Sequence, residues 1–106
     1  MLFRSKATIL KVKARKLDAN ISPELKGEFL VLCAPQTKEL IIDLEDVDFC
    51  DSSGLSALLI AERKMRENSG VVKLAGMQKK VMTLIKISHL DRAFKIYDTV
   101  AKAVKT

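Results

Sequence analysis

The sequence has no tryptophan, and only 5% of its 106 residues are aromatic. A hydrophobic core must therefore consist mainly of aliphatic side chains, which are plentiful because 48% of the residues are hydrophobic. No apolar run approaches the roughly 20 residues of a membrane-spanning helix, and nothing near the start resembles a secretory signal. We therefore expect a cytoplasmic protein without membrane insertion, in which residues 1–106 form a single domain.

Cysteine, histidine and glycine are too scarce for the common metal and nucleotide sites. Cys33 and Cys50 are the only cysteines, and His89 is the only histidine. Neither cysteine has a further cysteine or a histidine at the spacing of zinc ligands, so we expect reduced thiols and no metal. The four glycines form no phosphate-cradling loop, which leaves no basis for a cofactor.

Acidic charge is scarce at both ends of the chain. Residues 1–20 and residues 77–106 each carry a net charge of +5, whereas residues 21–76 carry −4. Basic ends of this kind can attract nucleic acid, but aromatics are few and no nucleic-acid-binding motif is present. Such lysines more often only solvate a surface, so we expect no nucleic-acid partner.

Apolar patterns predict strands and helices that alternate along the chain. The strands are predicted at residues 8–12, 40–44, 71–75 and 94–97, and the helices at 22–34, 53–66, 78–87 and from 99 onward. The continuous apolar run 40–44 is typical of the central strand of a parallel sheet, whereas interleaved lysines place 8–12 near an edge. This order indicates an α/β fold, in which sites gather at the carboxyl ends of the strands.

Two helix starts carry residues that are typical of caps. Ser22 is expected to cap the first helix, because Pro23 suits the first helical position and Glu24 complements the positive end of the helix dipole. Thr99 is expected to cap the last helix in the same way.

Residues 51–55 read Asp-Ser-Ser-Gly-Leu and are the most distinctive segment of the chain. They end an acidic stretch without basic residues, whose carboxylates belong to Asp43, Glu45, Asp46, Asp48 and Asp51. We expect both serine hydroxyls at a helix N-terminus, where a hydroxyl acts as a cap, a phosphate site or both. The acidic stretch is either a solvated turn or a partner-facing patch, and the glycine permits close packing of the helix.

These residues resemble a known family. The runs 40–44 and 47–55 resemble the hallmark segment of STAS domains, and most closely that of the small bacterial anti-sigma factor antagonists. Weaker matches at 17–18, 74–75, 87–91 and 94–96 extend the similarity over nearly the whole chain. The resemblance implies an α/β fold with a mixed, mostly parallel sheet of four to five strands and about four helices.

The resemblance also implies a non-enzymatic switch that regulates transcription. In that family, an anti-sigma factor that is itself a serine kinase phosphorylates the serine directly after the motif's aspartate, which is Ser52 here. The unmodified antagonist binds this kinase and frees a sigma factor, whereas the phosphorylated form is released until a PP2C-type phosphatase restores it. We expect a monomer or a weak dimer.

The resemblance assigns site residues to two places in the chain, at Asp18 and within residues 48–54. Ser52 is the expected phosphorylation site and Ser53 the second candidate. The expected partner-binding residues are Asp18, Asp48, Asp51, Ser52, Ser53 and Gly54. The family often has glycine two residues before the Leu17-Asp18 pair, where this chain has Arg15.

Elementary electrostatics is consistent with such a switch. A phosphate on Ser52 would add about −1.5 to −2 charges at pH 7. Free N–H groups at a helix start can accept that charge locally, so the domain need not unfold. Docking would bury the phosphate beside Asp51 and Asp48, and each ~1.4 kcal/mol of repulsion and desolvation lowers affinity about tenfold.

Two other classes of function remain to be weighed. An enzyme would use Ser52 as nucleophile and His89 as base, with Asp91 or Asp18 to orient the histidine. However, the glycine spacing of a nucleophile elbow is absent. We therefore expect no catalytic residue. A STAS-like adaptor that is never phosphorylated, such as a subunit of a lipid-transport or signalling assembly, has the same sequence pattern.

Overall fold

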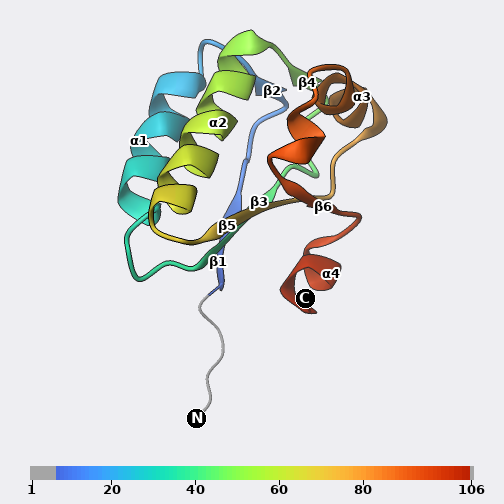
Figure 1. Cartoon of the computed structure of the whole chain (residues 1–106). Helices are drawn as coiled ribbons and strands as arrows, with labels where there is room; N and C mark the ends of the chain where they lie inside the picture. Colours follow the sequence, from blue (N-terminus) through green and yellow to red (C-terminus); the bar gives the residue numbers. More distant parts are fainter. Residues whose placement is uncertain (1–6, 106) are drawn as a thin grey trace.

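The computed structural model describes residues 7–105, in which strands and helices alternate as predicted (Figure 1). The strands are β1 (Ala7–Lys11), β2 (Lys16–Leu17), β3 (Glu39–Asp43), β4 (Phe49–Cys50), β5 (Val71–Ala75) and β6 (Lys95–Tyr97). The helices are α1 (Ser22–Leu32), α2 (Ser52–Glu67), α3 (Lys79–Ile87) and α4 (Val100–Lys105), with a 3₁₀ turn, η1 (Leu90–Arg92). Every predicted element is present with bounds within two residues, which confirms the α/β class.

Four strands form the main sheet in the order β1-β3-β5-β6, and each neighbouring pair is parallel. The predictions of β3 as a central strand and β1 as an edge strand are confirmed. A mainly parallel sheet with four helices was also predicted correctly, and every strand pair within residues 7–105 is parallel.

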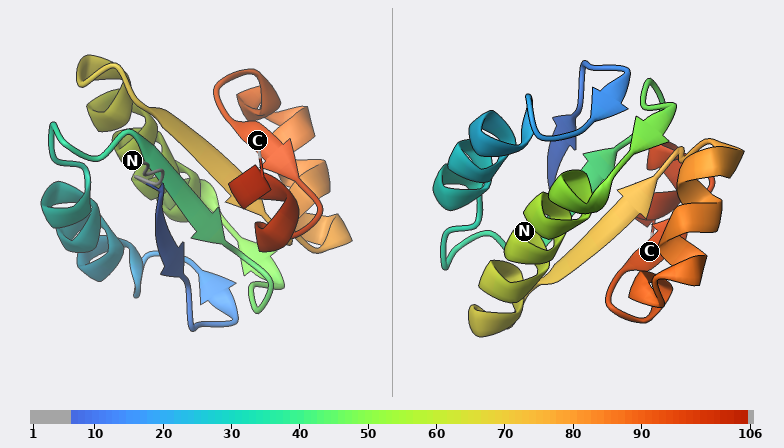
Figure 2. Two further views of the ribbon diagram at one scale, coloured as in Figure 1. Left: turned by 90° about the horizontal axis from the view of Figure 1, so that it is seen from below. Right: turned by 90° about the horizontal axis from the view of Figure 1, so that it is seen from above.

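Strands β2 and β4 were not predicted. They form a separate parallel pair in which Lys16 lies opposite Phe49 and Leu17 opposite Cys50. Each strand has only two residues, which is too short for an alternating pattern to stand out in the sequence. This pair lies beyond the carboxyl ends of β1 and β3, beside the first turn of α2 (Figure 2, right).

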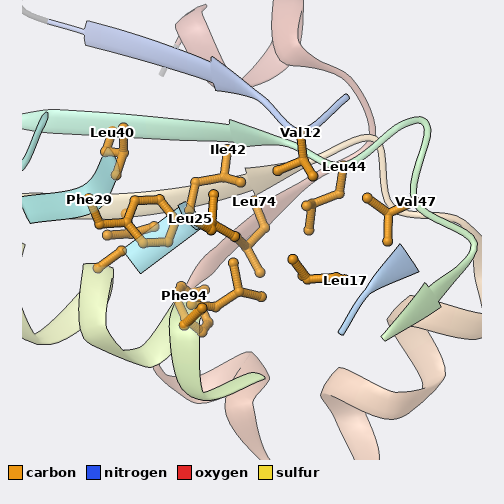
Figure 3. Close-up of a cluster of buried hydrophobic side chains, with 14 of the residues drawn as sticks. Val12, Leu17, Leu25, Phe29, Leu40, Ile42, Leu44, Val47, Leu74 and Phe94 are labelled. Carbon is orange, nitrogen blue, oxygen red and sulfur yellow. The ribbon is translucent and has the colours of Figure 1, made fainter. Parts of the chain in front are cut away.

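Helices cover the two faces of the main sheet unequally (Figure 2). On one face, Leu40, Ile42 and Leu74 pack against residues of α1 such as Leu25 and Phe29 (Figure 3). On the other face, buried Ile41 and Ala75 pack against Ala103 of the short helix α4. The larger cluster is mainly aliphatic, as the scarcity of aromatics predicted.

Lys73 is a buried charge on the face that α4 covers, with 2% of its surface exposed. Its ammonium group donates a hydrogen bond to the Ala103 carbonyl at 2.9 Å and lies 3.4 Å from the Glu39 carboxylate. It also lies 5.4 Å from the centre of the Tyr97 ring, within the range of a cation–π contact. Lys73 therefore helps to hold α4 on the sheet.

The structure corrects one predicted cap and confirms another. Ser22 does not cap α1, because it is the first helical residue and Ile21 occupies the cap position. The Ser22 hydroxyl instead donates to the Ser53 carbonyl at 3.1 Å, which ties α1 to the start of α2. At α4 the prediction holds, since the Thr99 hydroxyl oxygen accepts from the Lys102 N–H at 3.1 Å.

Candidate functional site

The Asp-Ser-Ser-Gly segment lies at the start of α2, as predicted. Asp51 is the N-cap: its backbone is extended, and its carboxylate accepts a hydrogen bond from the Gly54 N–H at 3.1 Å. Ser52 and Ser53 follow as the first two helical residues. The cap is therefore the aspartate, which leaves both serine side chains without that role.

Ser52 is the more accessible of the two serines. Its side chain is exposed, and its hydroxyl takes part in none of the hydrogen bonds within residues 7–105, whereas Ser53 is half-buried. The positive end of the α2 dipole and the unpaired N–H groups of its first turn lie beside this hydroxyl. A group that adds negative charge to Ser52 would therefore meet a favourable local field.

Gly54 is buried where α2 meets β2. A Cβ atom at this position would overlap the Leu17 carbonyl oxygen and lie 2.8 Å from Leu17 Cγ. Only glycine avoids both overlaps, so the packing function considered for Gly54 is present. The contact holds the start of α2 against β2, close to Asp18.

Asp18 follows β2 and organises the turn into α1. Its carboxylate accepts from the Asn20 N–H at 3.0 Å, and its carbonyl accepts from the N–H groups of Ile21 and Ser22. The half-buried Asp18 lines an open depression of about 440 Å³ together with Arg15 and other residues of this turn. Asp18 thus lies at the same end of the molecule as the serines.

Most carboxylates of the acidic stretch are paired with two bases from the start of the chain. Lys11 Nζ lies 3.2 Å from the Glu45 carboxylate and 3.8 Å from that of Asp46. Arg15 binds one carboxylate oxygen of Asp48 through two nitrogens, at 2.7 and 3.0 Å. This hydrogen bond lowers the pKa of Asp48, and the charge of Arg15 and of the more distant Lys80 and Lys16 adds to the effect. The stretch is therefore tied to the end of β1 and to the segment after it rather than being an isolated negative pole.

Sequence reasoning missed Phe49 as a surface residue. Its ring is 47% exposed although the next residue, Cys50, is buried. The available signal was the alternation between Phe49 and Cys50, which places neighbouring residues of a strand on opposite faces.

His89, Cys33 and Cys50 are the other residues with side chains suited to chemistry. His89 follows α3 in a left-handed turn (φ 61°), and its side chain is exposed. Within residues 7–105 no hydrogen bond joins it to Ser52, and no cluster of three metal-ligating side chains occurs. Both cysteines are buried and free, and burial raises the pKa of Cys50 to about 11. No helix in the described part of the chain has the length and apolar character to span a membrane.

Residues 2–103 match the family model of the STAS domain. An anti-sigma-B factor antagonist of Listeria monocytogenes is 28% identical over 83 residues, which cover 78% of this chain and 73% of that protein. A candidate anti-sigma factor antagonist of Thermotoga maritima is also 28% identical, over 67 residues and 63% of this chain. That match spans 59% of the length of the Thermotoga relative.

Solved structures show the same fold. The crystal structure of a candidate anti-sigma factor antagonist from Thermotoga maritima superimposes with a TM-score of 0.84 at 23% identity, covering 99% of this chain and 92% of that one. A sulfate transporter family protein from Wolinella succinogenes superimposes with a TM-score of 0.82 at 16% identity, over 99% and 87%. The Bacillus cell fate determinant SpoIIAA in its phosphorylated form gives 0.73 at 16% identity, over 99% and 94%.

Proposed function

This chain belongs to the STAS domain family, and we propose that it is an anti-sigma factor antagonist whose activity is switched by phosphorylation of Ser52. Unmodified, it binds an anti-sigma factor that is a serine kinase and so frees a sigma factor in the cytoplasm. The relatives named as anti-sigma factor antagonists support this partner class. The protein itself carries out no catalysis, and a PP2C-type phosphatase returns it to the binding form.

The observation that carries the proposal is the state of the Ser52 hydroxyl. It is exposed at the first residue of α2, and no hydrogen bond within the described residues holds it in place. A kinase can therefore reach it without opening the fold. A phosphate there would meet the N–H groups at the helix start, which favour anions, although Asp51 already takes up the Gly54 N–H.

The remaining proposed contacts surround Ser52 at the same end of the molecule. Asp18 and Ser53 lie near it because Gly54 packs on Leu17 and Ser22 binds the Ser53 carbonyl. Asp48, which Arg15 holds in place, lies just before β4 on the other side. A partner that covers Ser52 would contact this set, and a phosphate would oppose that docking through charge and desolvation.

The proposal is tested by measuring how tightly this protein binds purified anti-sigma factor kinases from the organism that encodes it. We expect the wild type and Ser52→Ala to bind one of them with equal affinity, and Ser52→Asp to bind at least tenfold more weakly. Ser56→Asp is a matched control, because Ser56 is exposed one turn further along α2. Equal binding by Ser52→Asp and the wild type would contradict the switch.

A STAS adaptor that is never phosphorylated is the second candidate. The structural similarity to a sulfate transporter family protein favours it, since that protein shares the fold at a comparable TM-score. In this case the same surface would bind a constant partner, such as a subunit of a lipid-transport or signalling assembly. Incubation with the kinases and ATP separates the candidates, because an adaptor would not become phosphorylated at Ser52.

A further inference from the structure

A large apolar side chain is exposed three residues before Ser52. The pair β2 and β4 buries Leu17 and Cys50 on its inner face and presents Lys16 and Phe49 on its outer face. The Phe49 ring is 47% exposed in a protein with only five aromatic residues. Exposed aromatic side chains are frequent anchors of protein interfaces.

Two exposed lysines lie on elements that contact β4, which carries this ring. Lys16 lies directly opposite Phe49 in β2, and Lys80 lies in the first turn of α3, which packs against β4. Both lysines are close enough to Asp48 to lower its pKa. Their ammonium groups are exposed and take part in none of the ion pairs or side-chain hydrogen bonds within residues 7–105.

The two acidic side chains that flank Phe49 in the sequence are already engaged. Asp48 is held by Arg15 at 2.7 Å, and Asp51 caps α2. The other acids of the stretch lie around Lys11. The outer face of the β2–β4 pair therefore carries an exposed apolar ring, with Lys16 opposite it and Lys80 on the adjacent helix, at the end of the molecule that carries Ser52.

We propose that Phe49, Lys16 and Lys80 form a docking surface for an acidic protein face, in which carboxylates surround an apolar pocket that receives the Phe49 ring. This inference rests on the proposed function and specifies the partner as an anti-sigma factor with such a face. The lysines steer the two proteins together, and the ring supplies the buried contact. An acidic partner also explains the direction of the switch, because a phosphate on Ser52 adds negative charge opposite negative charge.

The test measures affinity for the anti-sigma factor kinase by calorimetry at low and high salt. Phe49→Ala is expected to weaken binding at least tenfold. The double variant Lys16→Glu, Lys80→Glu is expected to weaken it at least tenfold and to reduce its salt dependence. The double variant Lys86→Glu, Lys105→Glu is the control, since it makes the same change of net charge at two exposed lysines outside this surface. It is expected to bind within twofold of the wild type.

The outcomes separate this inference from the proposed function. Circular dichroism shows whether the Phe49 and Lys16/Lys80 variants are folded. If the folded variants bind the kinase as tightly as the wild type does, the docking surface is wrong and the proposed function stands. If the wild type binds no anti-sigma factor, both are wrong. If the charge reversal abolishes binding to duplex DNA but leaves kinase binding unchanged, the surface is a nucleic-acid site and the inference is overturned. Restored binding between the Lys16→Glu, Lys80→Glu variant and a partner with carboxylates changed to lysine would support it.

Discussion

Gly54 lies directly against the backbone carbonyl of Leu17, with no room between them for even a methyl group. This contact joins the first turn of α2 to β2. It thereby sets where Ser52 stands relative to Asp18 and to the outer face of the β2–β4 pair. The glycine of the Asp-Ser-Ser-Gly segment is thus required by packing before any partner binds.

Gly54→Ala is expected to destabilise the protein by about 1–3 kcal/mol. The added methyl group would overlap the Leu17 carbonyl oxygen, a backbone atom that moves only with β2. Chemical denaturation monitored by circular dichroism measures the change in the free energy of unfolding. An unchanged or higher free energy would show that the contact is looser than described.

Gly27→Ala is the matched control in the exposed part of α1. Nothing lies within 4 Å of a Cβ atom at this position, and the residue is helical. Alanine is expected to stabilise the protein by roughly 0.5–1 kcal/mol, because it costs less backbone entropy than glycine. Opposite signs for the two substitutions would separate packing from helix propensity.

Replacing the cap and replacing the serine are expected to have different effects on stability. Asp51→Ala removes the acceptor of the Gly54 N–H and should cost about 1 kcal/mol, whereas Asp51→Asn keeps a capping oxygen and should cost less. Ser52→Ala removes a hydroxyl without a partner among the described residues and should change stability by less than about 0.5 kcal/mol. Thermal and urea unfolding of the three variants test this order. A large loss in Ser52→Ala would reveal a structural role for that hydroxyl.

The main strands and helices could be predicted from the sequence, because their hydrophobic periodicity and cap residues lie within short segments of the chain. The run at residues 40–44 predicted a buried central strand, and β3 is that strand. The ion pairs of Lys11 and Arg15 with the acidic stretch join residues more than 30 positions apart, and no local pattern encodes them. Ser22 shows a subtler limit: it is a suitable cap residue, but the helix begins at Ser22 itself and the cap is one position earlier.

The carboxyl of Asp48 is expected to titrate below the roughly 3.9 of an unperturbed aspartate, because Arg15 stabilises its charged form. Its folded-state pKa is lowered, so its contribution to stability is present above the unfolded pKa and is lost as pH falls through the folded value. Arg15→Gln should move the midpoint upward. Carbon-detected NMR titration of the Asp48 carboxyl measures the midpoint in the wild type and in the variant. An identical midpoint in both proteins would show that the pair does not persist in solution.

Cys50 is expected to react slowly with iodoacetamide in the native protein. Its pKa is raised to about 11 by burial and by the nearby Asp51 carboxylate, so thiolate is scarce at pH 8. Labelling should be roughly 100-fold slower than in the denatured chain, with Cys33→Ala used to observe Cys50 alone. Because the folded pKa exceeds the unfolded value of about 8.5, stability is expected to fall as pH rises between the two. Equal labelling rates in native and denatured protein would contradict the buried thiol.

The proposed switch depends above all on regulated phosphorylation of Ser52. The most direct test is intact-mass and phosphopeptide analysis of the protein isolated from its own cells, across growth and stress conditions. The partner switch predicts a form heavier by one phosphoryl group, mapped to Ser52, whose fraction changes with condition. An unmodified Ser52 in every condition would contradict the switch and favour the constant adaptor, with Asp51-Ser52-Ser53-Gly54 reduced to the start of a helix.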